Sequence, residues 1–291
     1  MLPSFRLPSS GRDSASSVGS GAGLGLGARL ESASGRRRFV ALIATGLAVM
    51  LAGCATTGTD RYGGETSQAG QLVVVTTAGW DANQGRLQRF ERDGQRWRPV
   101  GDPADVTIGR AGSAWGLGLH PAQHDGPVKR EGDGRAPAGL FRIGTAFGYA
   151  DRAATALPYS AMTVSDYCID VSDSPLYNRI VDAETVGEAA VAGSTEPMRR
   201  DLHAGGDQRY RQGFVIEHNR DGVAGAGSCI FAHLWKAPGE ATAGCTAMDD
   251  GEMDRLLAWL KPEAQPVFVL LPQAQYAQHW RAWGLPEPVE R

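Results

Sequence analysis

A cysteine and a histidine that lie twelve positions apart are the residues of this chain whose types and spacing could do chemistry. Cys245 ends the small-residue run ATAGC, which predicts an exposed turn where a substrate could approach closely and N–H groups could stabilise an oxyanion. His233 follows a strand-like run at 228–232, and the loop after it could fold the two side chains together. A thiol of ordinary pKa, about 8.5, is only partly ionised at neutral pH, so a nucleophilic cysteine needs such a neighbour. The alternative is a core histidine beside an inert buried cysteine, and the spacing alone leaves both open.

Zinc binding is a second chemistry that these residue types could serve, since His218, Cys229, His233 and Cys245 are four soft ligands. If residues 229–233 form a strand, Cys229 and His233 lie about 13 Å apart at ~3.3 Å per residue. Ligands of one zinc ion lie roughly 2.0 to 2.3 Å from the metal and nearly touch each other. The spacing therefore argues against zinc, and we expect no metal site.

Short β-branched and apolar runs dominate the elements that must position these residues, and they lie at 72–76, 140–143, 214–217, 229–232 and 267–271. One helix is expected from Asp249, which has the capping-box spacing to Glu252, through an apolar stripe to its end before Pro262. A second helix is expected at about 273–283. No repeat or linker divides residues 71–291, so we expect a single, mainly β domain with a few packed helices.

The first 53 residues predict a disordered n-region followed by a signal peptide. Residues 9–34 are nearly all Gly, Ser, Ala and Leu, a composition that does not offset the cost of ordering the chain. Three arginines at 36–38 then precede an apolar run at 39–52, which is shorter than the roughly 20 residues of a membrane-spanning helix. A membrane anchor helix is the alternative. Twin-arginine export and a start codon downstream of Met1 stay open.

The run ends in Leu51-Ala52-Gly53-Cys54, which resembles a bacterial lipobox. That resemblance implies that Cys54 is lipidated and anchors an exported, periplasmic protein to a membrane, with the outer membrane as one candidate. The Gly/Thr/Ser stretch at 54–70 has no periodicity and is expected to be a flexible tether.

The other cysteines, Cys168, Cys229 and Cys245, would lie in an oxidising compartment, where an odd number leaves one thiol over. Our hypothesis pairs Cys168 with Cys229, each of which is next to an isoleucine, and leaves Cys245 free. The formal net charge is −3 and the basic residues beyond the leader are dispersed, so nucleic acid is not an expected partner.

Several motifs in order resemble the YkuD-type L,D-transpeptidases. The segments GSCIFAH at 227–233 and GEATAGC at 239–245 are similar to that family's His…(Ser/Thr)-x-Gly-Cys signature. The segment KREGDGRAPAGLF at 129–141 is similar to its Lys-x-x-Gly-Asp-x-x-Thr-Pro-x-Gly-x-Phe segment, with Ala136 where Thr is usual. Residues 174–179 and 213–219 also resemble the branch of the family in which the domain stands alone. The resemblance covers about 72–272 and implies a YkuD-like, β-sandwich-type domain.

The resemblance implies acyl transfer on peptidoglycan stem peptides, hence a role in cell-wall organisation and cell shape. Cys245 would be the nucleophile, His233 the general base, and the N–H groups of Gly244 and Cys245 part of an oxyanion hole, with Thr242 at the Ser/Thr position. The thiolate would attack the carbonyl before the terminal D-alanine, and the amine of a second stem peptide would take the acyl group. No metal or organic cofactor is implied. The group that orients His233 is not readable from sequence, although a backbone carbonyl can serve.

The chain departs from the family pattern after the cysteine, where Arg or Asn is common and this chain has Thr246-Ala247-Met248. This departure leaves substrate-carboxylate recognition without an assigned residue. Lys129, Glu131 and Asp133 are expected to be structural or at the cleft edge. Two rival functions stay open: a carboxypeptidase or other murein hydrolase that uses water as the acceptor, and a non-catalytic wall-binding lipoprotein.

Overall fold

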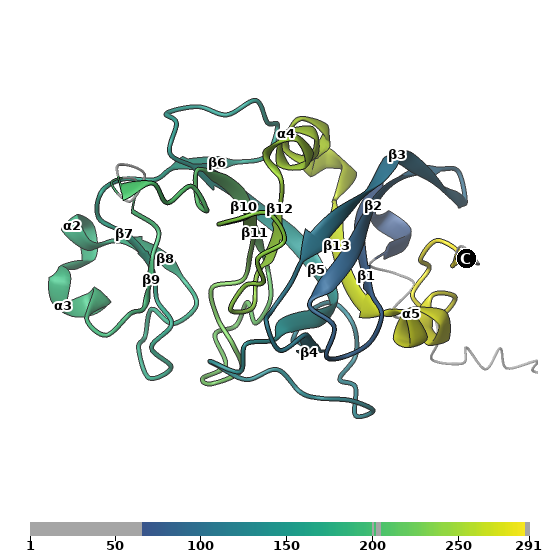
Figure 1. Ribbon diagram of the computed structural model, residues 1–291, viewed down its shortest axis with the longest axis horizontal. Helices are drawn as coiled ribbons and strands as arrows, with labels where there is room; N and C mark the ends of the chain where they lie inside the picture. The colour runs from purple at the N-terminus through teal and green to yellow at the C-terminus, as the bar shows by residue number, and fades with distance from the viewer. Residues whose placement is uncertain (1–65, 200, 202–204, 289–291) are drawn as a thin grey trace, which may run out of the picture. The chain divides into compact units, whose positions relative to one another are not determined.

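The computed structural model describes residues 66–199, 201 and 205–288 (Figure 1). The predicted leader, the lipidation site at Cys54 and most of the predicted tether lie outside the described residues. Thr66 and Ala69 are buried, the Thr66 hydroxyl donates to the Trp283 carbonyl, and the Gly70 N–H donates to the Ala264 carbonyl at 2.6 Å. Residues 66–70 therefore pack as part of the domain, which begins earlier than the expected residue 71.

Eight strands pair in a closed ring. The ring follows the order β10 (Gln212–Ile216), β11 (Phe231–Leu234), β12 (Thr246–Met248), β3 (Arg96–Thr107), β2 (Gln84–Asp93), β1 (Gln71–Thr77), β13 (Val267–Pro272) and β5 (Ala136–Gly148). It closes where β5 pairs with β10 through Phe214↔Ala146 and Ile216↔Ile143. Two short strands, β4 (Ser113–Trp115) and β6 (Tyr159–Ala161), add to β5. The structure confirms a mainly β domain, and its main sheet is a closed barrel, whereas a sandwich-type arrangement was expected.

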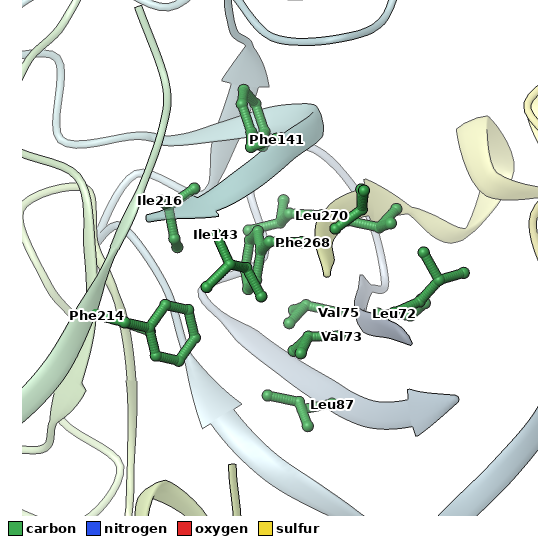
Figure 2. Close-up of a cluster of buried hydrophobic side chains, with 14 of the residues drawn as sticks. Leu72, Val73, Val75, Leu87, Phe141, Ile143, Phe214, Ile216, Phe268 and Leu270 are labelled. Carbon is green, nitrogen blue, oxygen red and sulfur yellow. The ribbon is translucent and has the colours of Figure 1, made fainter. Parts of the chain in front are cut away.

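The hydrophobic core fills the barrel. Figure 2 shows Leu87, Phe141, Phe214 and Phe268 among the apolar side chains from several barrel strands that gather there, and all four are buried. Strands β1 and β13 pair in parallel and are buried along almost their whole length, which explains their continuous apolar sequences.

Two helices cover parts of the barrel. Helix α4 (Asp250–Trp259) begins where predicted, since the Asp249 carboxylate accepts the Glu252 N–H at 3.0 Å. Helix α5 (Gln273–His279) packs on β1 and β13 and ends before the expected residue 283. A 3₁₀ turn, η2 (Pro262–Ala264), follows α4. No helix among the described residues is both long and apolar enough to cross a membrane.

A second, three-stranded sheet has the order β8 (Ile180–Asp182), β7 (Asp166–Cys168) and β9 (Glu196–Pro197), and we call it the small sheet. Two one-turn helices, α2 (Ala183–Val186) and α3 (Glu188–Val191), lie between β8 and β9 in the chain (Figure 1). A disulfide joins Cys168, at the end of β7, to Cys229, just before β11. The small sheet is therefore tied covalently to the barrel, and the bridge is the one hypothesised from the sequence.

Candidate active site

Cys245 and His233 come together because their strands are neighbours. Cys245 directly precedes β12, which pairs in parallel with β11 so that Ala232 lies opposite Thr246 and His233 opposite Ala247. Side chains alternate along a strand, and Ala232 and Leu234 belong to the barrel core. His233 therefore points out of the barrel, where it lines a cavity of about 100 Å³ together with Cys245.

The Cys245 thiol is buried, with 7% of the residue exposed, whereas the sequence predicted an exposed turn. Its Sγ accepts the Phe231 N–H at 3.3 Å and donates to the Cys229 carbonyl at 3.4 Å. Burial, as the largest cause, and the nearby Glu196 carboxylate together raise the pKa of the thiol to about 12. Cys245 thus rests as a neutral thiol, which would need a base in order to attack a substrate.

The orientation of His233 would allow it to serve as such a base. Its Nδ1 lies 2.7 Å from the Leu234 carbonyl, which can only accept, so Nδ1 carries the proton and Nε2 keeps a lone pair. Burial lowers the pKa of the imidazole to about 4, which keeps it neutral at ordinary pH. The ring of Tyr210 packs edge-on against the imidazole with 5.3 Å between centroids. The group that orients His233 is therefore a backbone carbonyl.

Thr242 and Gly244 shape the turn that leads to Cys245. The Thr242 hydroxyl donates to the Cys245 carbonyl at 2.6 Å and accepts the Gly244 N–H at 3.1 Å. Thr242 is itself bonded to the end of β3, donating its N–H to the Ile108 carbonyl at 3.0 Å. The Gly244 N–H is thus bonded to the Thr242 hydroxyl in this structure, and the oxyanion role expected for it stays a prediction. Both residues hold the turn in place.

Replacing Thr242 by valine keeps the side-chain shape and removes both hydrogen bonds. We expect a loss of about 1 to 3 kcal/mol in unfolding free energy, since the Cys245 carbonyl and the Gly244 N–H lose their partner. Acylation of Cys245 should slow roughly tenfold because the turn loosens. Thermal unfolding and the acylation rate measure the two effects. Thr242→Ser keeps the hydroxyl and should retain both properties, so equal losses in the two variants would contradict this role.

The disulfide fixes the surroundings of Cys245. Cys229 has a left-handed backbone with φ of +56°, its N–H donates to the Asn178 Oδ1 at 2.8 Å, and its carbonyl accepts the Cys245 thiol. On the other side, Cys168 lies opposite Glu196 in the small sheet, and Glu196 lines the cavity that holds Cys245. One covalent link therefore fixes the thiol's acceptor and a cavity wall.

Removing the bridge by Cys168→Ala with Cys229→Ala should lower the unfolding free energy by about 4 kcal/mol, because the bridge closes a loop with a sequence separation of 61. Acylation of Cys245 should slow as well, since the Cys229 carbonyl and the small sheet lose their anchor. Denaturant unfolding measures the first effect, with the wild-type protein under reducing conditions as the matched comparison. An unchanged unfolding midpoint would contradict the role of the bridge.

The residues of the KREGDGRAPAGLF segment support the site from a distance. The Lys129 ammonium pairs with Asp133 at 2.6 Å. The Glu131 carboxylate accepts the hydroxyl of Ser228 at 2.7 Å and that of Tyr177. Since Ser228 precedes Cys229, these contacts hold the segment that leads to the disulfide, and none of the three charged residues lines the cavity of Cys245.

The four residues considered for zinc have other roles. Cys229 is in the disulfide, and both His218 nitrogens bond to the backbone, Nδ1 to the Leu117 N–H at 3.1 Å and Nε2 to the Ala226 carbonyl at 3.0 Å. Within the described part of the chain, no group of three or more His, Cys, Asp or Glu side chains could hold a metal ion.

Sequence reasoning missed five lining residues of the cavity: Glu196, Arg209, Tyr210, Lys236 and Glu240. The first three lie 49 to 35 positions before Cys245, in or beside elements that meet it only in the folded chain. A larger cavity of about 480 Å³ lies between the small sheet and β5, β10 and β11, but neither Cys245 nor His233 lines it. We therefore place the candidate active site at the smaller cavity.

No family model matches the chain, and no curated protein matches it. Among solved structures, Bd1075 of Bdellovibrio bacteriovorus aligns with 75% of this chain at 11% sequence identity and a TM-score of 0.33. The alignment covers 62% of the Bd1075 chain, so this protein spans less than two thirds of its length.

Proposed function

We propose that this protein is a cysteine acyltransferase of the L,D-transpeptidase type that acts on peptidoglycan stem peptides. The observation that carries the proposal is the shared cavity of Cys245 and His233, in which the Leu234 carbonyl fixes the proton on Nδ1 and leaves Nε2 as a base. A neutral thiol beside a neutral, oriented imidazole is the arrangement that general-base activation of a nucleophile requires.

The reaction proceeds in two halves. His233 Nε2 takes the thiol proton as Cys245 Sγ attacks the carbonyl before the terminal D-alanine, and the Phe231 N–H, 3.3 Å from Sγ, stabilises the developing thiolate. The imidazolium then protonates the leaving amine of D-alanine, and a thioester remains. In the second half His233 takes a proton from the attacking amine, the C–N bond forms, the C–S bond breaks, and Sγ recovers its proton.

The YkuD-like fold, the export route and the lipid anchor belong to the same proposal. A signal peptide cleaved before Cys54 and acyl chains on that cysteine keep the enzyme at a periplasmic membrane surface. The formal net charge of −3 and the dispersed basic residues argue against a nucleic-acid partner.

Intact-mass spectrometry of the full-length chain incubated with a stem tetrapeptide tests the proposal. We expect a mass increase equal to the acyl tripeptide, a single modified peptide that contains Cys245, and release of D-alanine. Cross-linked dimers among the products mean transpeptidation, while free tripeptide alone means hydrolysis by the same acyl-enzyme. A folded protein that forms no adduct with any donor in a stem-peptide series would overturn the proposal and favour the wall-binding lipoprotein.

A further inference from the structure

The cavity beside Cys245 carries charges of both signs. Arg209 and Lys236 line it with positive charge, and Glu196 and Glu240 line it with negative charge. Its volume of about 100 Å³ equals that of about three water molecules, which suits one small molecule. A small compartment lined by charges of both signs is complementary to a small ligand that itself carries both charges.

Arg209 is pre-oriented on one wall. Its Nε donates to Asp207 Oδ1 at 3.0 Å and its Nη2 donates to Asp207 Oδ2 at 2.6 Å. Both bonds use one edge of the guanidinium, and Nη1 has no hydrogen-bond partner within residues 66–199, 201 and 205–288. The guanidinium also lies 5.9 Å from the centre of the Tyr210 ring, and this same ring packs edge-on against the His233 imidazole. A fixed guanidinium with a free N–H edge is the group that best recognises a carboxylate.

Glu196 also lines the cavity, and it lies in β9 of the small sheet. Its Oε1 accepts the Tyr210 hydroxyl. Its register partner Cys168 carries the disulfide, so the carboxylate is held relative to the barrel. Burial raises the pKa of Glu196, which makes this carboxylate a better proton acceptor than an exposed one. Because the Tyr210 ring packs against His233 and its hydroxyl donates to Glu196, the Glu196 carboxylate lies on the His233 side of the cavity.

We propose that Arg209 and Glu196 form a subsite for a small zwitterionic amino acid, with Arg209 binding the carboxylate and Glu196 binding the amino group beside Cys245. The inference rests on the proposed function. The proposal makes Arg209 the residue that recognises the substrate carboxylate. The residues after the cysteine, Thr246, Ala247 and Met248, carry no positive charge for this role.

The subsite holds the departing D-alanine, and it lets a free amino acid attack the acyl-enzyme in the reverse direction. The ammonium group gives one proton to Glu196, the freed amine attacks the thioester carbonyl, and a C–N bond forms as the C–S bond breaks. The second amine proton passes through His233 to Sγ, and Glu196 releases its proton to solvent. Exchange of the terminal residue therefore needs no oxidant or other co-reactant.

Label exchange tests the subsite. The full-length chain is incubated with a stem tetrapeptide and either deuterated D-alanine or deuterated D-alaninamide, which lacks the carboxylate, and incorporation into the tetrapeptide is followed by mass spectrometry. We expect the wild type to prefer D-alanine by roughly ten- to a hundredfold, the range for a hydrogen bond to a charged group. Arg209→Gln should remove that preference, so that the ratio of D-alanine to D-alaninamide incorporation approaches one. Glu196→Gln should slow both acceptors.

Arg211→Gln is the matched control, because Arg211 lies two positions away, pairs with Asp250 and does not line the cavity. Arg209→Lys keeps the positive charge, so it should recover part of the preference and serves if Arg209→Gln does not fold. An acyl-enzyme that forms normally but uses both acceptors equally, or an Arg209→Gln protein that keeps the preference, overturns the subsite. If no acyl-enzyme forms, the proposed function fails. In that case the binding of D-alanine is measured by calorimetry. Weaker binding by Arg209→Gln than by the wild type still supports the subsite, and equal binding by the two proteins overturns it.

Discussion

Replacing Cys245 by alanine is expected to abolish acyl-adduct formation and D-alanine release. Cys245 is the one free cysteine within the described residues and its Sγ is the only thiol that lines the candidate cavity, so no other group there can form the thioester. The loss should exceed about 10⁴-fold, the range found when a catalytic nucleophile is removed. The measurement is intact mass after incubation with the donor, together with an assay of released D-alanine.

The alanine variant also loses two contacts of the sulfur, with the Phe231 N–H and the Cys229 carbonyl. These buried groups would then lack a partner, which costs about 1 to 3 kcal/mol. Cys245→Ser is therefore the control for folding, because a hydroxyl can make the same two contacts and is a far weaker nucleophile. A folded serine variant without adduct assigns the chemistry to the thiol. An adduct that persists in either variant at another residue would contradict the assignment.

The sequence predicted the Cys245 and His233 pair because the pair is local. Only a loop separates the ends of two neighbouring strands, and the register between β11 and β12 brings the two residues onto adjacent strands. The apolar runs could be predicted as strands for the same reason, since the alternation of side chains and the bounding glycines are local signals. The N-terminal cap of α4 could likewise be predicted from the spacing of Asp249 and Glu252.

Features that depend on distant parts of the chain could not be predicted from the sequence. Barrel closure requires β5 to pair with β10, which no local pattern specifies. Cys245 is buried because it packs in a cluster with Cys168 and Cys229, which come from distant parts of the chain, so the small residues around it indicated exposure wrongly. Arg209 and Glu196 reach the cavity from separate elements, and as single charged residues in polar segments they carried no sequence signal.

The burial of the Cys245 thiol and of the His233 imidazole determines when the proton moves in the proposed reaction. An exposed cysteine beside a charged histidine would rest as an ion pair. Here burial holds the thiol pKa at about 12 and the imidazole pKa at about 4, so both groups are neutral between these values. The proton therefore moves when the thiol attacks rather than before, and this order makes the contribution of His233 separable from that of the thiol.

Replacing His233 by glutamine is expected to slow acylation by about 10² to 10⁴-fold at pH 7, the contribution typical of a general base. The pH profile distinguishes this from a structural defect. In the wild type the base is neutral above its pKa of about 4, so activity should stay level from pH 8 to about 5 and fall as the pH passes through about 4. An imidazole with the ordinary pKa of about 6.5 would lose half its activity near pH 6.5 instead. Acylation is measured as a first-order rate over pH 4 to 10.

In His233→Gln the thiol must ionise without help, so its residual rate should rise about tenfold per pH unit towards the thiol pKa of about 12, while the wild-type rate stays flat. Folding must be measured in parallel. The folded state binds fewer protons at His233 than the unfolded state, so wild-type stability falls as the pH drops from about 6.5 to 4, and rates there are divided by the folded fraction. A variant whose rate falls by the same factor at every pH would show that His233 only supports the fold. The divergence of the two profiles above neutral pH is therefore the observation that identifies His233 as the base.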